Sequence, residues 1–131
     1  MASEIEAHID LAKEMLQGAE LDIANRFPRG ASSRAYMVME HAARSMLLAE
    51  GERLGKHQAV IGEFGRLFAK PARVDAKFHR YLIDDFDLRN VAEYDPLPDP
   101  PVTMDRAMEA LEHAREFLDM AERFLKGREG L

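Results

Sequence analysis

The positions of the six prolines constrain the fold of this chain more than any other feature. They fall in three places, at residue 28, at residue 71 and between residues 96 and 101. Proline interrupts the interior of a helix because it has no backbone N–H and its ring clashes with the preceding turn. Each place lies between segments whose apolar residues recur with helical spacing, and no segment shows strand-like alternation. The prolines therefore divide the chain into successive helices.

The first two helices are predicted on either side of Pro28. The first has one apolar stripe, made of Ile5, Ile9, Ala12, Leu16, Ala19 and Ile23. We expect residues 28–30 to break the chain and Ser32 or Ser33 to cap a second helix over residues 33–50. That second helix is apolar around much of its girth. It is therefore either central to the fold or partly covered by a second subunit.

Three further helices are predicted after Gly51, which ends the second. A short one covers residues 58–68 and a longer one residues 74–92, and the proline-rich residues 96–101 form an extended connector. Thr103 caps the last helix, whose apolar residues keep a 3.5-residue period from residue 104 to residue 125. Pairs at i,i+4 spacing, Asp119–Arg123 and Glu122–Lys126, support its outer face.

These helices predict an all-α, up-and-down bundle of four long helices plus one short helix, in a single domain over residues 1–131. The absence of cysteine suits a reducing cytoplasm. The acidic N-terminus does not resemble a signal peptide, and no apolar run approaches the roughly 20 residues of a membrane span. We therefore expect a cytoplasmic protein without a membrane partner.

Charge and metal-ligand patterns exclude several functions. The net charge of −6 argues against a general nucleic-acid coat, although basic residues cluster at 26–34 and 66–80. Each cluster is either a local phosphate-binding face or a solvated helix surface. A di-iron bundle needs Glu-x-x-His on two helices, and no acidic residue here has a histidine three positions later. The sequence predicts no metal site and no cofactor.

Three stretches, in order along the chain, resemble segments of HEPN domains. They are AYMVMEHAARSMLLAEG at residues 35–51, KHQAVIGEFG at residues 56–65 and RNVAEYD at residues 89–95. The resemblance implies a helical bundle that usually forms a homodimer. Many members are RNases that act as toxins or defence effectors, and a number are paired with a small nucleotidyltransferase as antitoxin.

The resemblance also implies where a site would lie. The family's active motif is an arginine followed, after four to six residues, by a histidine, with two copies facing one another across the dimer cleft. Cleavage is metal-independent and uses the RNA 2′-hydroxyl as nucleophile. Arg89 matches the motif arginine and Asn90 the polar residue that often follows it, but Tyr94 stands where the histidine belongs. Arg89, Asn90 and Tyr94 are therefore the candidate catalytic residues, and Arg89, Asn90 and His57 the candidate ligand-binding residues.

Tyr94 is a weak substitute for the missing base. A tyrosine with a pKa of about 10 is ionised in roughly one molecule in a thousand at pH 7. Arg89 can still supply a planar cation for phosphate. It can equally be part of a salt-bridge ladder with Asp85 and Glu93, each one turn away.

Three functions follow from these observations. The first is a dimeric protein, weakly active or inactive as an RNase, that binds RNA or a nucleotide and is paired with a nucleotidyltransferase in a toxin–antitoxin or defence system. The second is an active, metal-independent RNase toxin with a displaced base. The third is a helical protein-interaction module that does not bind nucleic acid.

Overall fold

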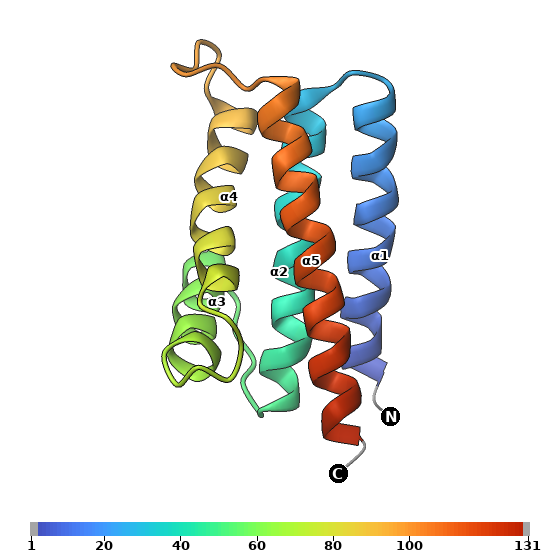
Figure 1. Cartoon of the computed structure of the whole chain (residues 1–131), viewed down its shortest axis with the longest axis vertical. Helices are drawn as coiled ribbons and strands as arrows, with labels where there is room; N and C mark the ends of the chain where they lie inside the picture. Colours follow the sequence, from blue (N-terminus) through green and yellow to red (C-terminus); the bar gives the residue numbers. More distant parts are fainter. Residues whose placement is uncertain (1–2, 130–131) are drawn as a thin grey trace.

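A computed structural model describes residues 3–129 and shows a bundle of antiparallel helices (Figure 1). The long helices are α1 (Ser3–Ala24), α2 (Pro28–Ala49), α4 (Lys77–Tyr94) and α5 (Met104–Glu129). The short helix α3 (His57–Phe64) continues into a π-helical turn, η1 (Gly65–Ala69), beside the beginning of α4. The predicted up-and-down bundle of four long helices and one short helix is confirmed.

Helix α2 forms the centre of the bundle. It packs against α1, α3, α4 and α5, and twelve of its residues are buried. Its apolar girth is therefore covered by the other helices of the same chain, which decides between the two explanations that the sequence left open. No helix within residues 3–129 combines the length and the apolar character needed to cross a membrane.

The predicted start of α2 is wrong by five residues, because the chain turns before Pro28 rather than after it. Arg26 adopts the left-handed conformation, with φ at 61°, and the N–H of Phe27 bonds the carbonyl of Asp22 at 2.7 Å. Proline is favoured in the first turn of a helix, where its missing N–H has no partner to lose. Neither serine caps the helix, and the Ser32 hydroxyl donates to the carbonyl of Pro28 at 2.8 Å.

Other helix ends follow the sequence more closely. Gly51 ends α2 in the left-handed region, with φ at 84°, and the next N–H bonds the carbonyl of Leu47. Thr103 caps α5 by accepting a bond from the N–H of Arg106 at 3.2 Å. Helix α4 is shifted by two or three residues at each end, and the predicted short helix is divided between α3 and η1.

One of the two predicted ion pairs on α5 forms. Asp119 and Arg123 lie 3.0 Å apart, as predicted. Glu122 instead reaches across to Lys13 of α1 at 3.2 Å, because the two helices are neighbours in the bundle.

Candidate functional site

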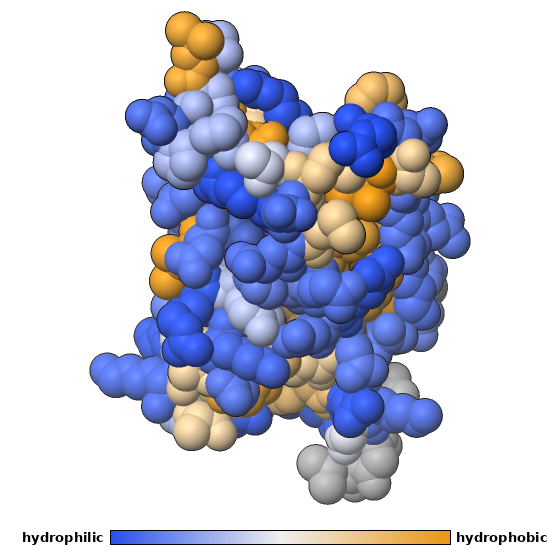
Figure 2. Space-filling model, turned by 45° about the horizontal axis from the view of Figure 1, so that its top comes forward, coloured by the Kyte–Doolittle hydropathy of each residue, from blue (hydrophilic) through white to orange (hydrophobic). Residues whose placement is uncertain are grey.

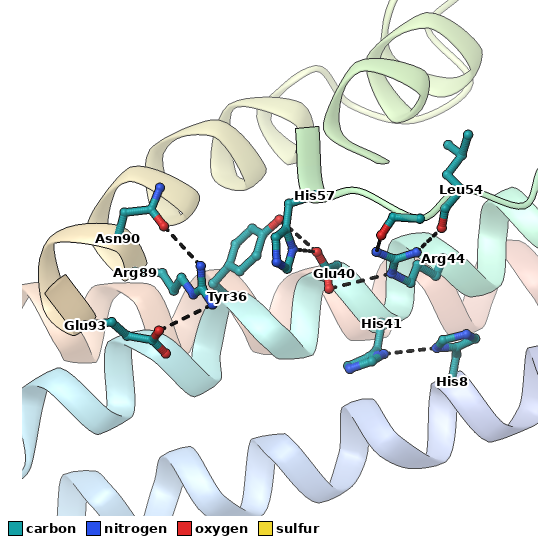
Figure 3. A network of polar contacts seen from close by, with 11 residues as sticks. His8, Tyr36, Glu40, His41, Arg44, Leu54, His57, Arg89, Asn90 and Glu93 are labelled. Carbon is teal, nitrogen blue, oxygen red and sulfur yellow. Dashed lines mark hydrogen bonds and ion pairs between the residues drawn. The ribbon is translucent and has the colours of Figure 1, made fainter. Parts of the chain in front are cut away.

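Arg89 lies in the last turns of α4, with its guanidinium turned along the helix toward Asn90 and Glu93 (Figure 3). Its Nη1 donates to Asn90 Oδ1 at 3.1 Å, and its Nη2 lies 3.3 Å from Glu93 Oε2. The guanidinium carbon is 5.7 Å from the centre of the Tyr94 ring. The side chain is only 16% exposed, so these contacts hold it in one orientation.

One hydrogen-bonding group of Arg89 has no partner. Its Nε is buried and makes no hydrogen bond. Among the residues that the structure describes, no other buried side-chain nitrogen or oxygen lacks a partner. A buried donor without an acceptor is costly, and such groups are usually found where a ligand or water completes the bonding. One donor of the guanidinium is therefore left unsatisfied by the described residues.

The predicted salt-bridge ladder on α4 forms on one side only. Glu93 pairs with Arg89, as expected from their spacing. Asp85 does not, because its buried carboxylate accepts a hydrogen bond at 2.9 Å from Nδ1 of His113 on α5. Helix packing therefore overrides the local i,i+4 spacing and leaves Arg89 with a single acidic neighbour on its own helix.

The beginning of α2 holds the end of α4 in place. Arg29 donates to the carbonyls of Ala92 and Asp95, at 3.1 and 2.7 Å. The Ser33 hydroxyl donates to the carboxylate of Glu93. These bonds satisfy terminal carbonyls that a helix end leaves free and fix the turn that carries the Arg89 motif.

The basic residues between 26 and 34 are therefore partly occupied by structural contacts. Arg29 bonds the end of α4, and Arg34 pairs with Asp22 of α1. In the second basic segment, Arg66 pairs with Glu63, Arg73 with Glu50 and Lys77 with Glu116. Neither segment is an uninterrupted phosphate-binding face.

His57 and Glu40 form the centre of a polar network beside Arg89 (Figure 3). His57, the first residue of α3, directs Nδ1 at Glu40 Oε1, and the Glu40 side chain is 3% exposed. The Tyr36 hydroxyl donates to the same oxygen at 3.3 Å, and Arg44 Nε lies 3.6 Å from the other. The carboxylate of Glu40 is thus held by a histidine, a tyrosine and an arginine.

Tyr36 and Phe86 pack beside His57, and Tyr36 also lies within electrostatic range of Arg89. The Tyr36 ring is 5.9 Å from the His57 ring and 5.3 Å from the Phe86 ring, between ring centres. Burial, and then the charge of Glu40, raise the pKa of Tyr36, while the charge of Arg89 acts to lower it. The Tyr36 ring therefore lies between Arg89 and His57 (Figure 3).

The charges of Arg89 and His57 both affect the pKa of Glu93. The hydrogen bond from Ser33 lowers the pKa of Glu93 most, and the charges of Arg89 and His57 lower it further. Glu93 thus lies within electrostatic range of both Arg89 and His57. The use of Arg89, Asn90 and His57 as ligand-binding residues stays a prediction.

Tyr94 lies at the edge of this network, where its hydrogen bond also helps to lower the pKa of Glu93. It is 70% exposed at the end of α4, and its contact with Arg89 is through the ring face. The three predicted catalytic residues are consequently neighbours, but only Arg89 and Asn90 are joined by a hydrogen bond.

The remaining histidines lie in other contacts. His41 of α2 and His8 of α1 share a hydrogen bond between their Nδ1 atoms at 3.0 Å, and their rings are stacked. Burial lowers the pKa of both. His79 donates through Nε2 to the carbonyl of Ile61 at 3.1 Å. No group of three or more potential ligands able to hold a metal ion lies within residues 3–129.

Tyr36, Glu40 and Arg44 are not among the site residues expected from the sequence. A usable signal exists, because the three residues recur every four positions and so share one face of α2. A glutamate at the middle of an otherwise apolar helix face is uncommon unless it is paired. What the sequence does not reveal is that α3 places His57 against that face.

Comparison with known proteins gives consistent matches along most of the chain. The family profile described as HEPN domain matches residues 5–124. Putative toxin MJ0605 of Methanocaldococcus jannaschii is 32% identical over 94% of this chain and 90% of its own length. UPF0332 protein PH1297 of Pyrococcus horikoshii is 38% identical over 60% of this chain and 56% of its own length. Putative toxin MJ0142, also of M. jannaschii, is 28% identical over 70% of this chain and 63% of its own length.

Proposed function

Since this chain belongs to the HEPN domain family, we propose that it is a toxin-like protein that binds RNA or a nucleotide at Arg89 and Asn90. The single observation that supports the proposal is the buried Nε of Arg89, which has no acceptor among the described residues. A phosphate oxygen is a suitable acceptor, because guanidinium binds phosphate through planar, charge-assisted hydrogen bonds.

The residues around Arg89 are consistent with binding of an anion at moderate affinity. Asn90 is next to the guanidinium and offers an amide N–H₂ group while its oxygen accepts from Arg89. His57, whose side chain is 36% exposed, borders the same region and can contact the sugar or base. Glu93 already pairs with Arg89, so an incoming phosphate competes with a carboxylate.

Cleavage of RNA by this chain is weak or absent in the proposed function. The motif position that a histidine occupies in active relatives is held here by Tyr94, which is exposed and has only its ring face on Arg89. A protein with these properties acts mainly by binding.

We propose that the protein works as a homodimer beside a small nucleotidyltransferase. Four of the six large, exposed apolar side chains among the described residues lie at the end of the bundle that carries the Arg89 motif: Leu21, Phe27, Tyr94 and Leu97. Figure 2 brings this end forward and shows orange patches between hydrophilic side chains. A second copy seated there would bring two motifs together. Light scattering that finds a monomer at all concentrations contradicts this arrangement.

Binding of a labelled single-stranded RNA and of ATP to the purified protein tests the proposed ligand. We expect Arg89→Ala to weaken binding at least about tenfold, because a charge-assisted hydrogen bond contributes about 1.5–3 kcal/mol. Arg123→Ala is the matched control, since Arg123 is also in an i,i+4 ion pair but is 81% exposed on α5. Equal binding by the wild type and Arg89→Ala rejects the proposal.

A further inference from the structure

We propose that a basic groove between η1 and the beginning of α4 binds an acidic, extended segment of a partner protein (Figure 1). Three cationic side chains and a histidine line this groove together with four small residues: Arg66, Lys70, Arg80 and His79, with Gly62, Gly65, Ala69 and Ala76. The groove lies near the first turn of α4, whereas Arg89 lies in the last turns of the same helix. The two surfaces are therefore separate, and the inference does not depend on binding at Arg89.

The charge of the groove is opposite to that of the whole chain. The net charge of the chain is −6, yet none of the described residues that line the groove is acidic. Arg66 pairs with Glu63, through Nε at 2.8 Å and Nη2 at 2.7 Å. Lys70 and Arg80 make no ion pair and no side-chain hydrogen bond with any residue between 3 and 129. Two cations at the rim are therefore left for carboxylates from outside the chain.

The floor of the groove is made of residues with little or no side chain. A Cβ added to Gly65 would lie 2.6 Å from Cε1 and Nε2 of His79, so only a glycine permits this close approach of η1 and α4. A Cβ added to Gly62 would meet no tertiary contact within 4 Å, so open space lies over that position. A floor of this kind allows the main chain of a bound peptide to lie against the protein while its side chains reach the rim.

The walls of the groove are held in place by bonds within the chain. His79 donates through Nε2 to the carbonyl of Ile61 at 3.1 Å, which joins α4 to α3. The N–H of Lys70 bonds the carbonyl of Gly65 at 2.8 Å and closes the π-helical turn, a feature frequent at functional sites. The groove encloses about 360 Å³, within the range of about 300–1,000 Å³ typical of ligand pockets. A surface formed before the partner arrives costs less conformational entropy on binding.

The lining favours a peptide over a nucleic acid. Proteins that hold single-stranded nucleic acid combine a cationic groove with aromatic side chains on which the bases stack. The described lining contains no Phe, Tyr or Trp, and the ring of His79 is packed against Gly65. A long polyanion would also be repelled by the negative charge of the rest of the chain, whereas a short acidic segment contacts only the groove. Alternate side chains of an extended peptide lie on the same side, so glutamates at every second position reach one rim together.

Titration of the whole ¹⁵N-labelled chain with a capped octapeptide of alternating glutamate and serine, followed by NMR at low ionic strength, tests the assignment. We expect the amide signals of the groove residues to shift. The double variant Lys70→Gln with Arg80→Gln should weaken binding at least about fivefold, because two exposed ion pairs with the peptide are lost. The control Lys13→Gln with Lys126→Gln changes the net charge equally but lies on the side formed by α1 and α5, and it should bind as tightly as the wild type.

A steric variant tests the groove without changing its charge. Gly62→Leu places a side chain in the open space over the floor and should abolish peptide binding. The substitution meets no tertiary contact and replaces a glycine within α3, so the protein should be at least as stable as the wild type. Gly127→Leu is the matched control, because Gly127 also has open space around it but lies in α5. Urea denaturation verifies that both variants fold.

The outcomes distinguish this inference from the proposed function. Absence of shifts in the wild type, shifts elsewhere on the chain, or equal binding by the wild type and the groove variants overturns the inference. Tighter binding of pentauridylate, an RNA with the same number of negative charges as the peptide, at the same amides overturns the assignment to a peptide. Arg89→Ala should leave peptide binding unchanged, and its effect on the binding of RNA and ATP decides the proposed function separately.

Discussion

Two pairs of the same chemical type lie on different faces of this bundle, His57 with Glu40 and His113 with Asp85. In each, an imidazole donates through Nδ1 to a carboxylate that is at least nine-tenths buried. The surroundings differ. Arg44 lies against the first pair and Arg89 near it, whereas Glu109 and Glu116 lie near the second. A histidine–carboxylate pair is therefore not a site by itself, because the neighbouring charges decide whether an anion can approach.

Exposure separates the two histidines as well. The His57 side chain is 36% exposed and that of His113 18%. Tyr81 covers His113 with its ring 3.8 Å away and nearly parallel, and bonds Glu116 through its hydroxyl at 2.9 Å. We interpret the second pair as a device that stabilises the contact between α4 and α5.

The largest difference between the pairs is expected when the carboxylate is removed. Glu40→Ala should lower the free energy of unfolding by about 3 kcal/mol, because the Tyr36 hydroxyl and Arg44 lose their buried partner. Asp85→Ala should cost about 1.5 kcal/mol, because His113 becomes neutral and keeps some contact with solvent. Urea denaturation measures both, and an equal or larger cost for Asp85→Ala contradicts the comparison.

A smaller effect is expected on how the stability of the protein depends on pH. This dependence should distinguish His113 from the other histidines. Burial opposes its protonation, but the bond to Asp85 and the nearby carboxylates together raise its pKa above 6.5. Burial also raises the pKa of Asp85. Both groups hold protons more tightly in the folded chain, so their stabilisation is complete at low pH and is lost as pH rises through the raised values. Between pH 6.5 and 9, stability should fall less in His113→Gln than in the wild type. An unchanged slope contradicts this role.

The smallest effect is expected at the pair without a carboxylate, His8 with His41. Burial lowers both pKa values, so protons bind the unfolded chain first and stability falls as pH drops below about 6.5. His8→Gln keeps a hydrogen-bonding group and removes one titrating ring, so this acid-side loss should shrink. Thermal unfolding between pH 5 and 7 measures it, and a loss equal to that of the wild type would be incompatible with the shared bond.

Much of the fold could be predicted because each signal is local. Three such signals act within one or two helical turns, and each is confirmed. They are the spacing of three and four residues between apolar positions, the glycine at residue 51 and the threonine at residue 103. The sequence predicts a break at Pro28, whereas the structure begins α2 there. Proline is compatible with both positions, and the distinction depends on the preceding turn at Arg26.

The candidate site could be predicted only in part, because its contacts are long-range. Arg89 and Asn90 are adjacent in the sequence, so their association needed only a helix. The i,i+4 spacing offered Asp85 as one possible partner of Arg89, but Asp85 bonds a residue 28 positions away on α5. Similarly, the spacing of α2 residues indicates one face but not what packs on it, and His57 reaches Glu40 only after the loop and α3 have folded back.

The hydrogen bonds from Arg29 to the end of α4 have a consequence for how the protein is made. They join residues that are 63 and 66 positions apart. During synthesis, α2 has emerged long before the last turn of α4, so the turn that carries Arg89 has no anchor until most of the chain is available. The turn that carries Arg89 is therefore held in place only after α4 has packed against α2.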